Sequence, residues 1–425
     1  MTRRGLLASS LAAAQTPSRP NVLLVMADAW RGQALPSASD PNLVAPHLKR
    51  LAAEGMWCSR AYTSYPVCCP SRAAMWTGRL PHAAGVIRNH TRLPLDQPTM
   101  SAAFKHAGYR TGYIGKFHLD GRESPGFVPP ERRRGFDYWA AFNLAHRHYD
   151  AVYYRDSPEP VPMSGFEPDR ETELAVDFIK QKSSQPFFLC LSWVAPHAPF
   201  TPPPRWNGYE PAKLRLRENV PARSEVDARR DLAGYYGLCS ALDENLGLLL
   251  AELDRQGLAK STVVVFTSDH GETLGSHGVD EIDLPYEESS RIPLLIRYPL
   301  RFEGGSEFDG LASNIDLAPT LLGLCGLPQL EGTQGVDLFA EGVVRSESIY
   351  CEGQIGQPGE WRMVVRGLDK LVVNAALKPT HLFNLGQDPY ELKNLAEEGV
   401  ERRKVDELSA LIRRWAFRTG DRVGR

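Results

Sequence analysis

Short apolar runs that end beside an ionisable residue recur four times along the chain. They occupy residues 22–26, 111–115, 187–191 and 263–266, and they lead to Asp28, to Lys116 and His118, to His197, and to Asp269 and His270. Continuous apolar runs of this length are typical of strands that are buried on both faces of a sheet. The pattern therefore predicts four buried strands, each with chemistry-bearing residues at its carboxyl end.

Amphipathic segments lie between the apolar runs and predict helices. Their starts and stops carry proline, aspartate, threonine or glycine, and they cover residues 46–55, 99–108, 169–182 and 233–255. The alternation indicates an α/β fold with a large, mostly parallel sheet flanked by helices. Because ligands bind beyond the carboxyl ends of parallel strands, we expect the polar residues of the four strand ends to gather in one site.

The character of the chain changes after about residue 345. Residues 363–366 and 370–373 predict a hairpin, and residues 405–416 predict a helix. The sequence therefore predicts a catalytic domain at 19–345 and a smaller C-terminal α+β subdomain at 346–425.

Composition and charge exclude several classes of protein. In the 425 residues, 49 Lys and Arg face 51 Asp and Glu, giving a net charge of −2, which provides no general attraction for nucleic acid. The 42% hydrophobic content is that of an ordinary globular chain. No apolar run reaches the roughly 18 residues of a membrane span. The seven cysteines lack paired metal-site spacing, and they indicate neither a disulfide framework nor a zinc knuckle.

The first residues resemble an export signal. Arg3 and Arg4 precede a short apolar and small stretch that runs to Ala14, as in a twin-arginine leader. The alternative is an alanine-rich N-terminus with two incidental arginines. We expect residues 1–18 to be a signal and linker, and the protein to be periplasmic or secreted.

The most informative string runs from Cys68 to Arg79 and reads CCPSRAAMWTGR. Pro70 suits the first turn of a helix, and Gly78 suits its end. Cys68 would then lie at a helix N-terminus, where free backbone N–H groups favour an anion. The alternative for this string alone is a short helix with a buried structural thiol.

The same string resembles the signature of the formylglycine-dependent type I sulfatases, within the alkaline phosphatase superfamily. The shared elements are Cys68, Pro70, Ser71 and Arg72, followed by the Thr-Gly-Arg close at 77–79. The resemblance implies that a maturation enzyme oxidises Cys68, and not Cys69, to formylglycine. It further implies that the metal-bound hydrate of this residue attacks the sulfur of a sulfate ester.

The resemblance also assigns roles to the residues at the strand ends. One Ca²⁺ ion would be held by Asp28, modified Cys68, Asp269 and His270, and Arg72 would brace the modified residue. Lys116 and His118 would grip the sulfate and the formylglycine hydroxyls. His197 would touch the sulfate and the leaving group as a proton donor.

Two positions depart from the family pattern. Ala29 stands where a second aspartate or a glutamine is usual, and Ile282 stands where a sulfate-binding lysine is common. Loss of one charge-assisted contact costs about 1.5–3 kcal/mol of binding. His277 is a candidate to compensate for the missing lysine.

A polar and aromatic loop supplies candidates for contact with the leaving group. It contains Asn143, His146, Arg147, His148 and Tyr149, of which His146 and His148 are the predicted substrate-binding residues. The alternative is ordinary loop packing.

The expected function is hydrolysis of small-molecule or carbohydrate sulfate esters, of an arylsulfatase-like kind. One alternative is a phosphonate or phosphodiester hydrolase with the same formylglycine chemistry. Another, motivated by Ala29 and Ile282, is a non-catalytic relative that binds sulfated glycans.

Overall fold

The computed structural model describes residues 19–122, 126–280, 282–342, 346–396 and 401–424. The four predicted strands are confirmed and are slightly longer than their apolar runs. They are β1 (Asn21–Asp28), β3 (Arg110–Lys116), β7 (Phe187–Pro196) and β8 (Thr262–Ser268). The predicted export signal lies outside the described residues.

These strands form the centre of an eight-stranded sheet of order β10-β2-β9-β8-β1-β7-β3-β4. Its other strands are β2 (Met56–Tyr62), β4 (Tyr138–Phe142), β9 (Leu294–Arg297) and β10 (Ser306–Ser313). Only β9 runs against its two neighbours, β2 and β8, among the pairs of this sheet. The mostly parallel sheet is therefore confirmed, and the carboxyl ends of β1, β3, β7 and β8 lie at one edge.

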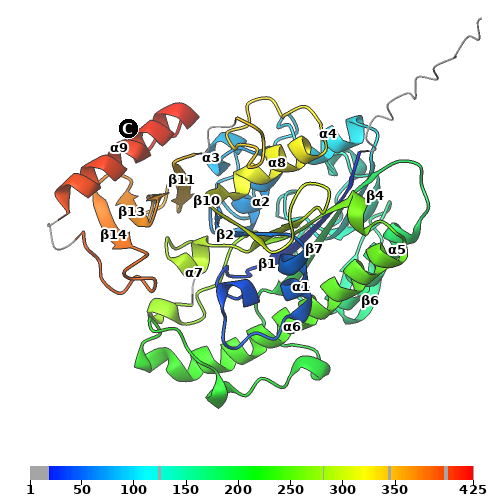
Figure 1. Ribbon diagram of the computed structural model, residues 1–425, viewed down its shortest axis with the longest axis horizontal. Coiled ribbons are helices and arrows are strands. Elements are labelled where there is room, and N and C mark those ends of the chain that lie inside the picture. The colour runs from blue at the N-terminus through cyan, green and yellow to red at the C-terminus, as the bar shows by residue number, and fades with distance from the viewer. Residues whose placement is uncertain (1–18, 123–125, 281, 343–345, 397–400, 425) are drawn as a thin grey trace, which may run out of the picture.

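Helices cover both faces of the sheet (Figure 1). Val22, Leu24 and Met26 of β1 pack in the cluster that contains α2 (Cys68–Thr77), α4 (Met100–His106) and α8 (Leu317–Leu324). The alternate residues Leu23 and Val25 pack in the other cluster. That cluster contains α1 (Pro46–Glu54), α5 (Glu167–Lys180) and α6 (Glu225–Arg255). Because successive side chains of a strand point to opposite faces, a strand between two helical layers must be apolar throughout.

The structure adds elements that the sequence pattern did not reveal. Helix α6 begins at Glu225, eight residues before the predicted start at 233. Smaller elements are α3 (Pro81–Ala84), α7 (Glu287–Ser290) and the antiparallel pair β5 (Tyr149–Tyr153) and β6 (Val161–Phe166).

The C-terminal part forms its own small sheet. The predicted hairpin is β12 (Trp361–Arg366) with β13 (Asp369–Asn374), and it is flanked by β11 (Ser348–Gly353) and β14 (Pro379–Asn384) in an antiparallel meander. Helix α9 (Arg402–Thr419) packs Leu408, Ile412 and Trp415 against this sheet. The α+β subdomain is therefore present (Figure 1).

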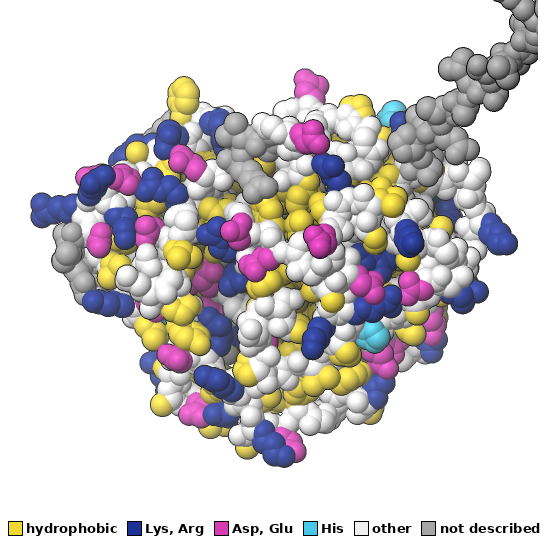
Figure 2. Space-filling view, viewed as in Figure 1, with side chains coloured by type: hydrophobic (Ala, Val, Ile, Leu, Met, Phe, Trp, Pro, Cys, Tyr) yellow, Lys and Arg dark blue, Asp and Glu magenta, His cyan; other side chains and the backbone are white. Residues whose placement is uncertain are grey.

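The surface and the cysteines agree with a globular protein. Figure 2 shows basic and acidic side chains interspersed over the viewed face. Within the described ranges, no helix has the length and apolarity required to cross a bilayer. All seven cysteines are buried and free.

Candidate active site

Helix α2 places Cys68 at its N-terminus, directly beside the ends of β1 and β8. The helix runs from Cys68 to Thr77 and is capped by Gly78, whose φ of 66° is the left-handed conformation expected at a helix terminus. Every residue of this helix is buried. The helix prediction made from Pro70 and Gly78 is therefore confirmed, and its first turn points into the site.

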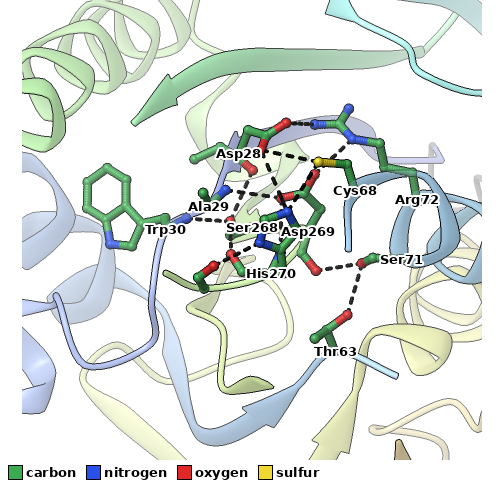
Figure 3. Close-up of polar contacts among 12 residues, drawn as sticks. Asp28, Ala29, Trp30, Thr63, Cys68, Ser71, Arg72, Ser268, Asp269 and His270 are labelled. Carbon is green, nitrogen blue, oxygen red and sulfur yellow. Dashed lines mark hydrogen bonds and ion pairs between the residues drawn. The ribbon is translucent and has the colours of Figure 1, made fainter. Parts of the chain in front are cut away.

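The Cys68 thiol is surrounded by polar groups (Figure 3). Its Sγ lies 3.3 Å from His270 Nε2, 3.7 Å from Asp28 Oδ1 and 3.7 Å from Lys116 Nζ. Cys69, in contrast, directs its Sγ to backbone carbonyls of Thr91 and His118. Burial raises the pKa of Cys69 to about 12, so this neighbour stays a thiol.

Asp28, Cys68, Asp269 and His270 each offer one ligand atom, and these atoms lie within 4.8 Å of one another. All four residues are buried. His270 Nδ1 lies 2.8 Å from the Gly271 carbonyl oxygen, which can only accept, so Nδ1 carries a proton. Nε2 faces the cluster, and loss of its proton would free it to bind a cation. Two carboxylates and a free imidazole nitrogen are a donor set that fits a divalent cation.

The negative charge of this cluster affects the pKa of His270. Burial favours the neutral ring, but Asp269, Cys68 and Asp28 raise the pKa of His270 to about 10. A buried group of negatively charged side chains requires a compensating positive charge, which a bound metal ion or a proton supplies.

Arg72 connects both aspartates to the strands β3 and β7. Its Nε donates to Asp269 at 2.9 Å and its Nη2 to Asp28 at 3.0 Å. Its Nη1 donates to the Lys116 carbonyl and to Ser192 Oγ. The guanidinium is fully buried, and all of its nitrogens are used, so it fixes the two carboxylates in place.

Lys116 lies at the end of β3 and faces Asp28 across the site. Its Nζ is 2.5 Å from Asp28 Oδ2 and 3.2 Å from His146 Nε2. Burial disfavours both charges, but the pKa of Asp28 is held well below its ordinary value by Lys116, His197 and Arg72. The pKa of Lys116 is raised because Asp28 and Cys68 outweigh its burial.

Two histidines form a stacked pair over this charge network. The rings of His146 and His197 lie 4.1 Å apart with an angle of 7° between their planes. Burial, Lys116 and His197 lower the pKa of His146 to about 3. The pKa of His197 is also lowered, mainly by burial, and its Nδ1 donates to the Ala198 carbonyl at 2.7 Å. Both rings are therefore neutral and present nitrogen lone pairs.

His118 and His148 occupy different positions around the site. Both ring nitrogens of His118 are buried without a protein partner, and burial and Lys116 hold its pKa well below the ordinary value. His148 Nε2 instead donates to the His197 carbonyl at 2.7 Å. His118 is thus free for a ligand, whereas His148 positions the backbone of His197.

The structure also describes Ala29 and Ile282, the two positions that depart from the family pattern. Ala29 is buried with a φ of 64°, and its backbone N–H donates to Asp269 Oδ1 at 3.2 Å. Ile282 is partly buried. His277 stacks on Tyr286 at 3.7 Å, and its Nε2 lies 3.0 Å from the Asn219 amide. His277 is therefore engaged with groups other than the Cys68 cluster.

Several supporting residues were not identified from the sequence. Ser71 Oγ donates to the Asp269 carbonyl at 2.5 Å and accepts from Asn314, and Tyr113 donates to the Lys116 carbonyl at 2.6 Å. Ser192 accepts from Arg72. The partners of Ser71 and Ser192 are far away in the sequence, and only Ser71 carries a signal, because it lies in the string that contains Cys68.

The geometry defines a class of protein. Three features lie together at the carboxyl ends of the parallel strands. They are a buried cysteine at a helix N-terminus, a group of side chains that can bind a cation, and a buried lysine and arginine that can bind an anion. This combination is that of a hydrolase that acts on esters of oxyanions.

Comparisons with known proteins give the family. The sulfatase family model matches residues 20–327. An ulvan-active sulfatase of Formosa agariphila is 34% identical over 424 residues, covering 95% of this chain and 82% of that protein. An endo-4-O-sulfatase of Bacteroides thetaiotaomicron is 28% identical over 456 residues, covering 90% of this chain and 89% of that protein. A crystal structure from Bacteroides fragilis, assigned to a yidJ sulfatase, has a TM-score of 0.89 and 27% identity, with coverage of 97% and 99%.

The chain therefore belongs to the sulfatase family, with the alkaline phosphatase-like fold. It is a sulfuric ester hydrolase.

Proposed function

We propose that this protein removes sulfate groups from sulfated carbohydrates with formylglycine formed at Cys68. The observation that carries the proposal is the position of the Cys68 Sγ, within 3.3–3.7 Å of His270, Asp28 and Lys116. The choice of carbohydrate is supported by relatives named ulvan-active sulfatase and endo-4-O-sulfatase.

A maturation enzyme converts the Cys68 thiol to the aldehyde. The hydrate of that aldehyde supplies two hydroxyls, one that attacks sulfur and one whose collapse expels sulfate. Cys69 is excluded from this role because its Sγ contacts the backbone carbonyls of Thr91 and His118 instead of the groups around Cys68.

Asp28, Asp269, His270 and the modified residue 68 would hold one Ca²⁺ ion. The ion supplies Lewis-acid stabilisation of negative oxygen, for which carboxylate ligands are suited. Arg72 keeps both aspartates oriented toward the ion.

The remaining residues bind and orient the sulfate ester. Lys116 and His118 contact the sulfate oxygens, and His146 orients Lys116 through their 3.2 Å contact. His197 is neutral in the free protein, and the negative sulfate beside it favours its protonated form. The protonated ring then gives its proton to the departing alcohol oxygen.

We further propose export, with residues 1–18 as the signal. Arg3, Arg4 and the following small and apolar residues support this assignment.

The test compares Cys68→Ala with Cys69→Ala in protein made with a maturation enzyme. Cys68→Ala should reduce release of sulfate from sulfated oligosaccharides to background, and Cys69→Ala should retain turnover. Mass spectrometry of the tryptic peptide 61–72 should show the mass loss of thiol-to-aldehyde conversion in the wild type and in Cys69→Ala.

Two outcomes would contradict the proposal. Faster turnover of an aryl phosphodiester than of any sulfate ester would identify a phosphodiester hydrolase. Fully modified protein that binds sulfated glycans without turnover would identify a binding protein.

A further inference from the structure

A cavity of about 340 Å³ is lined by residues that follow β1 and does not include Cys68, Asp28, Asp269 or His270 in its lining. Residues after Asp28 form one wall, where Arg31 and Gln33 line the cavity. A Cβ added to Gly271 would meet the Arg31 Cα at 3.2 Å, so the backbone of this wall packs directly on the active-site segment that follows Asp269. The volume is at the lower end of the roughly 300–1,000 Å³ typical of small-molecule sites.

Buried polar groups without partners line this cavity. Arg31 is 3% exposed, and its Nε has no hydrogen-bond partner. Both amide atoms of Gln33 are buried without a partner as well. Buried polar atoms are nearly always hydrogen-bonded in folded proteins, so a guanidinium N–H and an amide left open at a cavity wall indicate a ligand.

The charge of the cavity favours an anion. Four arginines line it, namely Arg31, Arg215, Arg217 and Arg291, against the carboxylates of Asp40 and Glu287. Of the four, only Arg217 has an ion pair with a carboxylate within the part of the chain that the structure describes, at 2.6 Å from Glu288.

The two carboxylates of the cavity are already satisfied. Asp40 accepts from the Tyr236 hydroxyl at 2.6 Å and from the backbone N–H groups of Asn42 and Leu43. Glu287 pairs with Lys370 at 3.2 Å. Arg31 donates to the Tyr236 hydroxyl at 3.3 Å, and within the described residues it has no direct ion pair with a carboxylate, although Asp40 is near enough to raise its pKa.

We infer that this cavity is a binding site for an acidic monosaccharide unit, which bears a carboxylate or a sulfate group. Arg31 and Arg215 would bind the anionic group, Gln33 would bind a ring hydroxyl, and Tyr390 provides an aromatic wall under Arg217. The anion is inferred from the cavity alone, whereas the saccharide rests on the proposed function. An enzyme with this second site would hold an acidic polysaccharide at a point outside its catalytic centre.

The experiment measures binding by isothermal titration calorimetry in a Cys68→Ala background, which prevents turnover. The ligands are D-glucuronate, D-glucose 6-sulfate and neutral D-glucose. Arg215→Ala and Gln33→Leu should each weaken binding of at least one acidic sugar by about tenfold or more. Lys213→Ala is the matched control, because Lys213 is an exposed cation two residues from Arg215 and does not line the cavity.

The acidic sugar whose affinity falls more in Arg215→Ala shows whether the cavity binds a carboxylate or a sulfate group. Equal dissociation constants in the background protein, Arg215→Ala and Lys213→Ala would overturn the inference. Glucose binding as tightly as the acidic sugars would overturn it too. Because binding is measured without turnover, a failure of the proposed catalytic function leaves this result unchanged.

Discussion

Among the single residues of the site, Arg72 has a central role because its positive charge pairs with two buried aspartates. It is fully buried and bonded to Asp28 and Asp269, which come from strands that are more than 200 residues apart in sequence. Its position four residues after Cys68 places it on the same helix face as that residue. One side chain thus joins the helix that bears the nucleophile to both strands that bear the aspartates.

Removal of Arg72 should damage stability as well as activity. Arg72→Ala removes the arginine partner of Asp269 and leaves Asp28 paired with Lys116 alone, and loss of one partner of a buried ion pair costs about 3–5 kcal/mol of unfolding free energy. Arg72→Lys keeps the positive charge but loses the forked contact with both aspartates. Its free energy of unfolding should therefore lie between those of the wild type and Arg72→Ala. Urea unfolding of metal-free protein measures the effect. Arg170→Ala, an exposed arginine of α5, should match the wild type, and equal stability of Arg72→Ala would refute the role of Arg72.

At the scale of elements, helix α5 brings two carboxyl groups beneath Lys116. Glu167 and Glu171 are one helical turn apart and buried, and none of their four carboxyl oxygens has a hydrogen-bond partner. Burial raises the pKa of Glu167 to about 8 against the opposing effect of Lys116. Burial and the neighbouring Glu167 raise the pKa of Glu171 well above its ordinary value.

These raised pKa values make stability depend on pH. Between the ordinary pKa of 4.5 and about 8, the folded protein keeps a proton on Glu167 that the unfolded chain has lost. The contribution of this group is therefore complete below pH 4.5 and is lost as the pH rises toward 8, on the order of 1 kcal/mol per pH unit.

Glu167→Gln should flatten this dependence. Unfolding free energies measured in urea between pH 5 and 8 should fall less steeply in the variant than in the wild type. Glu173→Gln, an exposed glutamate of the same helix, should show the wild-type slope. Identical slopes in all three proteins would mean that Glu167 is ionised in the folded state at pH 5.

At the scale of the whole molecule, the cation set joins three distant parts of the chain. Asp28 ends β1, Cys68 begins α2, and Asp269 and His270 follow β8. Since the unfolded chain does not hold these residues together, cation binding contributes directly to folding stability.

Calcium should therefore raise the melting temperature, and a chelator should lower it. At a free concentration 100-fold above the dissociation constant, the gain in stability is about 2.7 kcal/mol. Differential scanning calorimetry with Ca²⁺ or EGTA measures the shift. Asp269→Asn should lose most of it, whereas Glu173→Gln should keep it. A melting temperature that is insensitive to both Ca²⁺ and EGTA would contradict the assignment of the site.

The sequence alone determined the central architecture, and it predicted which residues lie at the ends of the central strands. The runs before Asp28, His197 and Asp269 are continuously apolar, and the run before Lys116 is small and apolar except for Thr111. Because helices cover both faces of the sheet, such runs could be recognised without a structure. The helix that starts at Cys68 was recognisable from Pro70 and Gly78, because their backbone preferences are local.

Tertiary structure decided what depends on distant partners. Strands β2 and β10 carry no continuous apolar run, and they pair with each other at one side of the sheet, with β10 at its edge. The stack of His146 on His197, the role of His148 and the cavity beside Arg31 arise from segments separated by tens or hundreds of residues. Periodicity and turn chemistry report only on neighbours along the chain, whereas burial and charge pairing depend on the folded arrangement.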